Sequence, residues 1–133
     1  MKTKIINAKI KTHPCFARIN YTTKTPWVIY IDIPDIFSFS AEGNDLFEAL
    51  QIARNEASKV GLTLLCNGAR LNVYPSPMMR SMGGAAMAYT LTLGEQAQRK
   101  NIVCIFDNTE EPISRIQIIS ATVMDWRGGE ASC

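Results

Sequence analysis

The first third of the chain alternates between apolar and polar residues, a period of two that is typical of half-buried β-strands. In residues 4–11 one side of this pattern is apolar, formed by Ile6, Ala8 and Ile10. Residues 16–21 continue the pattern with the apolar residues Phe16, Ala17, Ile19 and Tyr21. We predict a strand in each segment and a turn between them at His13-Pro14.

A longer apolar run occupies residues 25–34, where β-branched and aromatic residues continue almost unbroken up to Pro34. Such a run is consistent with a strand that is covered on both faces. The preceding residues, Lys24-Thr25-Pro26, are expected to form the turn that leads into it. The amino-terminal part of the chain therefore predicts three strands.

The strongest local signal is an amphipathic helix at residues 45–60. Its apolar stripe recurs at helical spacing and comprises Leu46, Ala49, Leu50, Ala53, Ala57 and Val60. Asp45 followed three residues later by Glu48 is a variant of the capping box, and both carboxylates favour the positive end of the helix dipole. Lys59 suits the opposite end, and Gly61 suits the position just past it. The sequence therefore predicts both ends of this helix.

Three further apolar segments have the length of strands, at residues 62–66, 87–93 and 101–107. The tail at residues 113–126 is ambiguous. Its IQII stretch is typical of a strand, whereas its apolar residues also recur at helical spacing behind Pro112. We favour a carboxy-terminal helix there, and a strand is the alternative.

Together these elements predict an α+β fold in a single domain over residues 1–133. We expect a single mixed or antiparallel sheet of about five or six strands, with one central helix on one face and a carboxy-terminal helix packed nearby. Strands, one helix and then more strands favour this arrangement over repeated βαβ crossovers. A chain of this length can be held together by one core without disulfides or metal.

Composition narrows the classes of partner. The chain has 14 Lys and Arg against 12 Asp and Glu, a formal charge of +2, which is too small to indicate nucleic-acid binding from bulk electrostatics. Its apolar runs stay well short of the roughly 20 residues that cross a bilayer. The amino terminus lacks the features of a signal peptide, so we expect a cytoplasmic protein with no membrane partner.

Motifs for enzyme chemistry are missing from the sequence. The patterns G-x-S-x-G, G-x-G-x-x-G and G-x-x-x-x-G-K-[ST] do not occur, and His13 is the only histidine. The four cysteines form no CxxC pair, so we expect neither a metal site nor a cofactor. These observations favour a non-enzymatic protein.

The segment from residue 67 to residue 86 is long for a connection in a compact domain, and such loops usually carry function. It offers two guanidinium groups, an amide, two hydroxyls and a glycine pair, which suit binding of an anionic or polar ligand. The candidate binding residues are Asn67, Arg70, Tyr74, Ser76, Arg80, Gly83 and Gly84. The structural alternative is that Arg70 and Arg80 are solvated or paired with acidic residues, and that the methionines fill the core.

The run DLFEAL, followed by LLCNGARLNVYPSPMMRSMGG, AYTLTLG and NIVCIFD, resembles a family of small, mostly uncharacterised bacterial proteins. The likeness covers residues 45–126, and the long middle motif is its specific part. Proteins of this kind include immunity proteins of contact-dependent growth inhibition systems. The resemblance implies a non-enzymatic protein that binds and neutralises a cognate toxin domain, with Arg70, Tyr74 and Arg80 as candidate anchors.

One property departs from immunity proteins that neutralise nucleases, which are commonly acidic: this chain is slightly basic. The immunity hypothesis therefore requires a toxin that is not strongly basic, or local acidic patches. Two candidate patches are Asp107, Glu110 and Glu111, and Asp32, Asp35 and Glu42. The alternative hypothesis is a small enzyme or ligand-binding domain that uses the 67–86 loop. Convergence of its polar side chains on one pocket would favour the ligand, and their attachment to the fold would favour a protein partner.

Overall fold

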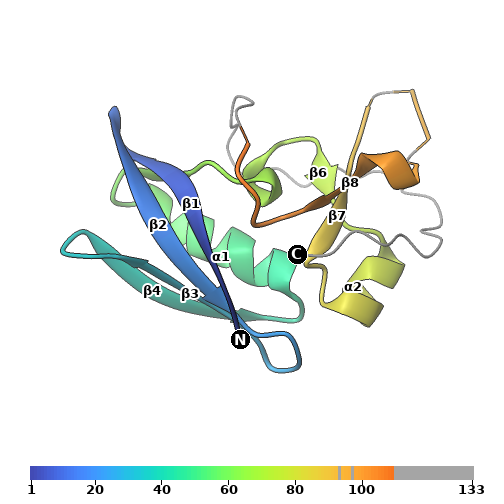
Figure 1. Cartoon of the computed structure of the whole chain (residues 1–133), viewed down its shortest axis with the longest axis horizontal. Coiled ribbons are helices and arrows are strands. Elements are labelled where there is room, and N and C mark those ends of the chain that lie inside the picture. Colours follow the sequence, from blue (N-terminus) through green and yellow to red (C-terminus); the bar gives the residue numbers. More distant parts are fainter. Residues whose placement is uncertain (93, 97, 110–133) are drawn as a thin grey trace.

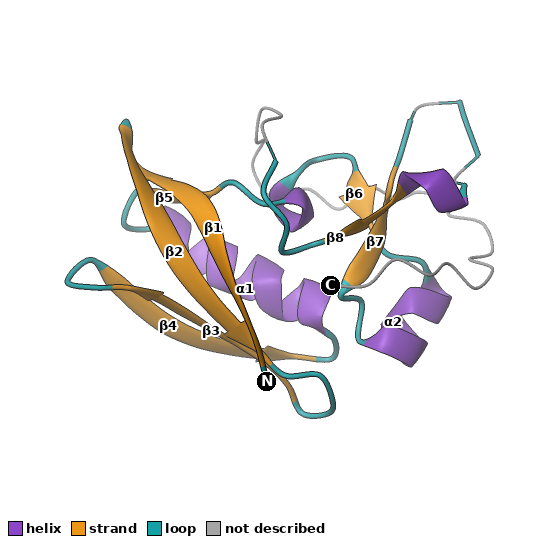
Figure 2. Ribbon diagram, viewed as in Figure 1, coloured by secondary structure: helices purple, strands orange, loops and turns teal. Residues whose placement is uncertain are grey.

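The computed structural model describes residues 1–92, 94–96 and 98–109. The described chain has an α+β fold with a curled antiparallel sheet of five strands, a second sheet of three strands and two α-helices (Figure 1). The larger sheet and the first helix form one layer pair, and the smaller sheet and second helix lie beyond one end of that helix (Figure 2).

The five-stranded sheet is built mostly from consecutive hairpins in the order β4-β3-β2-β1-β5. Its strands are β1 (Lys2–Ile10), β2 (His13–Tyr21), β3 (Trp27–Ile33), β4 (Phe37–Gly43) and β5 (Leu62–Leu64). Every neighbouring pair is antiparallel. The alternation of the sequence sets the face: Ile6, Ala17 and Ile29 are buried beneath the sheet. The opposite face of β1–β4, which we call the outer face, carries the intervening residues.

The helix α1 (Leu46–Ser58) packs on the inner face of this sheet and buries its apolar stripe up to Ala57, whereas Val60 lies beyond the helix and is exposed. The predicted N-cap is confirmed, because the Asp45 side chain accepts a hydrogen bond from the Glu48 amide at 2.8 Å. The Glu48 carboxylate returns to the Asn44 amide at 3.1 Å, one residue earlier than in a standard capping box. Gly61 follows the helix with a φ of 76°, the left-handed conformation that favours glycine.

The second sheet has the order β6-β7-β8 and is antiparallel. It comprises β6 (Val73–Tyr74), β7 (Met87–Thr90) and β8 (Ile102–Cys104), accompanied by α2 (Pro77–Gly83) and the short 3₁₀ turns η1 (Asn67–Ala69) and η2 (Arg99–Asn101). Backbone hydrogen bonds tie it to the first sheet near the end of β5. The Asn67 amide donates to Asp107, and the Gly68 amide donates to Ile105, each at 2.8 Å.

The prediction of one sheet is wrong, because the strands after β5 pair with one another instead of extending the first sheet. The chain turns away at η1, where Gly68 packs so closely that an added Cβ would lie 2.4 Å from Leu50 and 2.9 Å from Ile105. This tight approach lets residues 67–74 leave the plane of the first sheet. The predicted carboxy-terminal helix at 113–126 lies outside the described residues.

Three local predictions also need correction. The prediction of a turn at His13-Pro14 is wrong, because β2 already begins at His13. The chain reverses at residues 11–12, where Lys11 has a φ of 54°. The strand at residues 25–34 is covered on one face only, because the Tyr30 side chain is exposed. β4 was not predicted. No helix in the described parts of the chain has both the length and the apolar character needed to span a membrane.

Candidate functional site

Residues 67–86 are not an irregular loop but a chain of short elements running from η1 through β6 and α2 to the start of β7. Ser76 followed by Pro77 begins α2, and the Ser76 hydroxyl accepts from the Met79 amide at 3.2 Å. A serine N-cap followed by proline is a standard helix start. The pair Ser76-Pro77 is therefore a sequence signal for the start of α2, within the segment predicted to be a loop.

Arg80 of α2 pairs with the residue that caps the other helix. Its Nη1 donates to Asp45 Oδ2 at 2.6 Å, while Asp45 Oδ1 accepts from the first turn of α1. The Asp45 side chain is only 4% exposed and that of Arg80 is 30% exposed. The guanidinium that was expected to bind an anionic ligand is therefore already bound to a carboxylate of the protein.

Two aromatic rings complete the surroundings of Arg80. Its Cζ lies 5.4 Å from the centroid of the Phe47 ring and 5.1 Å from that of Tyr74. The two rings meet edge to face with centroids 5.4 Å apart. These distances are those of cation–π interactions, which stabilise a partly buried cation. Of the candidate residues, the structure thus brings Tyr74 and Arg80 together, and it adds Asp45 and Phe47.

Gly83 and Gly84 have different roles in the structure. Gly84 ends α2 with a φ of 65°, and its carbonyl accepts from the Leu46 amide at 2.6 Å. A Cβ on Gly84 would lie 2.5 Å from the ring of Trp27. Gly83 is exposed, and a Cβ there would meet nothing within 4 Å. Gly84 is therefore required by the contact between α2 and the first sheet, whereas Gly83 is open to solvent.

The remaining two candidates, Asn67 and Arg70, belong to the junction with β8. Asn67 is buried, and its Nδ2 donates to the Cys104 carbonyl at 3.2 Å. The backbone of Arg70 closes the η1 turn, because its amide donates to the Asn67 carbonyl at 3.1 Å. The Arg70 Nε atom is buried and has no hydrogen-bond partner within the described chain. Asn67 is thus a structural residue, while one donor of Arg70 is unused.

The residue just before this segment, Cys66, is a free and fully buried thiol. Burial raises the pKa of the Cys66 thiol from 9.0 to about 11, and the charge of Arg54 offsets only part of that effect. Such a thiol is poor as a nucleophile at neutral pH.

This pKa predicts a specific loss of stability in alkali. In the unfolded chain the thiol releases its proton near pH 9, whereas the folded chain retains it up to about pH 11. The free energy of unfolding should therefore fall between these pH values, by roughly 2 kcal/mol more than in the Cys66→Ala variant. Urea unfolding at several pH values measures the difference. Parallel pH profiles for the two proteins would contradict the prediction.

Of the two acidic patches expected from the sequence, one falls partly outside the described residues, and the other lies along β3, β4 and the turn between them. Asp107 binds Lys4 at 2.7 Å, and Glu110 and Glu111 lie outside the described residues. In the second set, Asp32 and Glu42 lie on the outer face of β3 and β4, and Asp35 lies in the turn between these strands with a φ of 63°. Within the described chain, no group of three His, Cys, Asp or Glu side chains is arranged to hold a metal.

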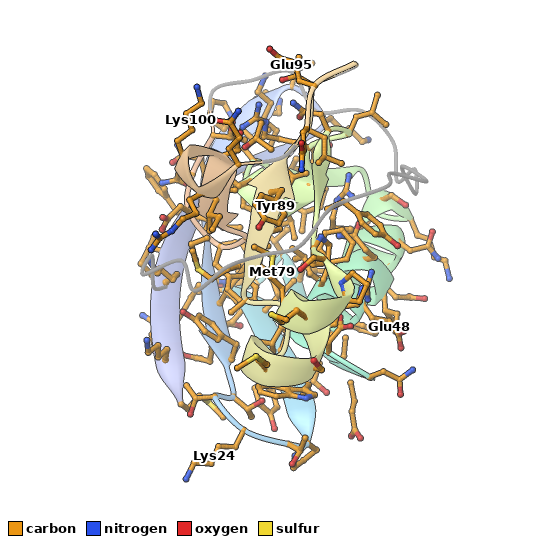
Figure 3. The ribbon with its side chains drawn as sticks, turned by 90° about the vertical axis from the view of Figure 1, so that its right-hand side faces the viewer. Lys24, Glu48, Met79, Tyr89, Glu95 and Lys100 are labelled. Atoms are coloured by element: carbon orange, nitrogen blue, oxygen red, sulfur yellow. The ribbon has the colours of Figure 1, made fainter. Side chains whose placement is uncertain are left out.

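Several polar side chains of residues 67–86 bond within the fold, whereas some of its apolar side chains are exposed. Leu71 is 38% exposed, Met78 is 43% exposed and Met82 is 72% exposed. Met78 and Met82 are one helical turn apart on α2, and Met79 between them is buried. Figure 3 faces the side of the molecule that carries α2, and it labels Met79 of α2 and Tyr89 of β7. We call Met78 and Met82 the methionine surface.

Comparison of the chain with protein-family models and with curated proteins finds no match.

Proposed function

We propose that this protein is a non-enzymatic immunity protein that binds and neutralises a cognate toxin domain in the bacterial cytoplasm. The observation that carries the proposal is the difference in exposure between polar and apolar side chains within residues 67–86. Asn67, Ser76 and Arg80 of this segment form hydrogen bonds within the fold, whereas the apolar side chains of Leu71, Met78 and Met82 are exposed. The resemblance of the CNGAR and YPSPMMRSMGG stretches to small bacterial proteins of this kind supports the same function.

The engagement of the polar groups argues against catalysis at this segment. A nucleophilic hydroxyl needs a neighbouring base, but the Ser76 hydroxyl is buried and caps α2. An anion-binding arginine needs free donors aimed at the ligand, but Arg80 is paired with Asp45 and lies between two rings. These residues build a rigid support for the methionine surface.

The methionine surface suits a protein partner. Methionine side chains are flexible and polarizable, and they are common where a surface must adapt to a partner. A specific complex buries on the order of 800 Å² per partner, and a few central side chains dominate its energy. Because the chain carries a formal charge of +2, the matching toxin domain is expected not to be strongly basic.

The direct test is co-expression with the product of the adjacent upstream reading frame. We expect the two polypeptides to co-purify in a fixed stoichiometry, and we expect growth arrest by the upstream product to be suppressed by this protein. An upstream product that is harmless, or that remains toxic and unbound when this protein is present, would refute the immunity function.

A matched pair of variants tests the methionine surface itself. Met82→Glu places a charge where an apolar contact is expected, so affinity for the toxin domain should fall at least about tenfold. Val60→Glu is the control. Val60 is also exposed, at 49%, but it lies just after α1 and is distant from α2 in the sequence. Titration calorimetry measures both affinities. Equal effects of the two substitutions would place the toxin elsewhere.

A second candidate function, binding of an anionic or polar small molecule, is favoured by one observation: the Arg70 Nε donor is buried without a hydrogen-bond partner in the described chain. Inorganic phosphate is the simplest probe. Under this alternative phosphate raises the thermal unfolding temperature, and Arg70→Ala abolishes the rise. An absence of any phosphate effect removes this candidate.

A further inference from the structure

The five-stranded sheet ends at β4, and one side of this strand pairs with no other strand of the described chain. The sheet order β4-β3-β2-β1-β5 gives β4 a neighbouring strand on one side only. On that side all seven residues of β4 pair with β3 without interruption, from Phe37 opposite Ile33 to Gly43 opposite Trp27. β4 is therefore a regular edge strand of more than average length.

Hydrogen bonding within the sheet shows which main-chain groups of β4 point away from it. Both main-chain groups of Val28 are directed at the side of β2, because its carbonyl accepts from the Thr22 amide at 3.1 Å and its amide donates to the Thr22 hydroxyl at 3.0 Å. Main-chain groups alternate between the two sides of a strand, so the odd-numbered residues of β3 bond to the odd-numbered residues of β4. The even-numbered residues of β4 therefore direct their amides and carbonyls at the open edge: Ser38, Ser40 and Glu42.

The opposite edge of the sheet is better protected. β5 has only three residues, and Asn7 of β1 is already bonded beyond it. The Asn7 carbonyl accepts from the Leu65 amide at 2.8 Å, and its amide donates to the Asn108 side chain at 2.7 Å. Short or covered edges keep a sheet from pairing with other chains, as do lysine, proline and bulges. β4 has no lysine, no proline and no bulge in its ladder with β3, so it is the edge that is open to a further strand.

We infer that β4 pairs antiparallel with β4 of a second copy of this chain, about a two-fold axis that passes through Ser40 perpendicular to the sheet. Ser40 is the central residue of β4, so this register pairs the whole strand. Ser40 then lies opposite Ser40, and Ser38 lies opposite Glu42 on both sides of the axis. Each of these three pairs forms two main-chain hydrogen bonds, which gives six between the copies.

On the inner face of the sheet this register places large side chains opposite small ones. Phe39 of one copy lies opposite the buried Ala41 of the other, and Phe37 lies opposite Gly43. The two phenylalanine rings are half-buried within one copy and stack with centroids 6.1 Å apart. An aromatic ring beside a glycine of the neighbouring strand compensates for the missing side chain. Pairing of the two strands therefore covers apolar surface that a single copy leaves partly exposed.

On the outer face the same register avoids contact between like charges, because Glu42 lies opposite Ser38 and not opposite a second Glu42. Other registers are less complete. Moving the axis by one residue, to Phe39 or to Ala41, leaves two residues of each β4 without a strand partner and reduces the main-chain hydrogen bonds to four. Backbone and side chains therefore favour the same axis.

The contact is small. One pair of strands buries less than the roughly 800 Å² per partner of a standard interface, so the dimer should be weak and reversible, with a Kd on the order of 10–100 µM. Sedimentation equilibrium of the full chain at roughly 5–500 µM brackets this range. The wild-type protein should shift with concentration from the 14.8 kDa chain mass towards twice that value.

A matched pair of lysine substitutions locates the contact. Ser40→Lys places two cations at the axis, so the variant should dimerise at least about tenfold more weakly. The Ser40 side chain is exposed, and its main-chain groups point away from β3, so the fold of each copy should be unaffected. Thr63→Lys is the control, because Thr63 is the exposed central residue of β5 at the opposite edge. It should dimerise like the wild type.

A disulfide tests the register directly. In Ser40→Cys the two introduced cysteines are a directly opposite pair, with Cα atoms about 5.5 Å apart, which suits a disulfide. In Ser38→Cys the two cysteines lie four positions apart along the paired strands, roughly 14 Å, which is too far. In a buffer containing oxidised glutathione, Ser40→Cys should form a covalent dimer, and Ser38→Cys should not exceed the background that the native cysteines give in the wild type.

Three results would overturn the inference: a wild-type chain that stays monomeric over the whole range, equal dimerisation of the Ser40→Lys and Thr63→Lys variants, or cross-linking of Ser38→Cys as efficient as that of Ser40→Cys. The test needs no toxin, so it is independent of the proposed function.

Discussion

Replacing Asp45 with alanine is expected to lower the free energy of unfolding by about 3 kcal/mol, the largest effect of any single carboxylate in the described chain. The substitution removes the N-cap of α1, which costs about 1 kcal/mol. It also leaves the Arg80 guanidinium without its partner in a largely buried position, which we estimate at about 2 kcal/mol because Arg80 retains some solvent contact. Chemical denaturation with urea measures the sum.

Two further variants separate these contributions. Asp45→Asn retains a good N-cap but removes the charge, so we expect a loss of about 1–2 kcal/mol. Arg80→Met removes the cation and keeps an apolar side chain between Phe47 and Tyr74. In the double-mutant cycle, the Asp45→Ala and Arg80→Met losses should fall short of additivity by at least about 1 kcal/mol. Additive losses would show that the ion pair contributes no coupling between α1 and α2.

The second large effect is expected from two adjacent glycines that should respond in opposite directions. Gly84→Ala forces a side chain into the left-handed conformation and places its Cβ 2.5 Å from the Trp27 ring. Strain and overpacking together should lower the free energy of unfolding by about 3 kcal/mol. Gly83→Ala meets no atom within 4 Å at the end of α2 and should be neutral or stabilising by up to about 1 kcal/mol.

This pair tests the docking of α2 on the first sheet without altering charge. Thermal and urea unfolding of the two variants under identical conditions gives the comparison. If Gly84→Ala is as stable as Gly83→Ala, then the contact between the end of α2 and Trp27 does not contribute to stability. If both variants are strongly destabilised, the segment tolerates no side chain at either position, and the predicted difference between Gly83 and Gly84 is wrong.

Local patterns predicted the elements whose stability is local. The helix at 45–60 was marked by its stripe, its Asp45 cap and Gly61, and the structure confirms it with bounds of Leu46–Ser58. Alternation likewise predicted β1 and the orientation of Ile6 and Ala8. These features depend on residues within a few positions of one another, so a sequence pattern is sufficient to reveal them.

The same alternation marks β4 and the exposed position of Phe16. In β4, Phe37, Phe39 and Ala41 alternate with serines and a glutamate, which is the same signal that identified β1. Strict alternation in β2 would have placed Phe16 on the side of Arg18, away from the core. The prediction for residues 16–21 groups Phe16 with the apolar residues Ala17, Ile19 and Tyr21, whereas the period of the strand places Phe16 on the opposite face.

The candidate site was beyond local patterns because its contacts join distant segments. Arg80 and Asp45 are 35 residues apart, and their pairing depends on how α2 packs against the start of α1. Hydrogen bonding to the Cys104 carbonyl, 37 residues away, gives Asn67 a structural role that its residue type does not reveal. The sequence predicts residues 67–86 as a candidate segment, but only the fold shows which of its side chains face solvent.

The junction between the two sheets also has a consequence for the order in which the chain acquires its structure. Lys4 binds Asp107, and the Asn7 amide donates to the Asn108 side chain, across 103 and 101 residues of sequence. The hairpins β1–β2 and β3–β4 close over short loops, whereas this junction requires nearly the whole described chain. During synthesis the hairpins can therefore pair before residue 107 has left the ribosome, and closure of the junction is a late step. The partly built sheet that precedes this step still lacks its link to residues 107 and 108, and the lifetime of that species sets how long the nascent protein is exposed to aggregation.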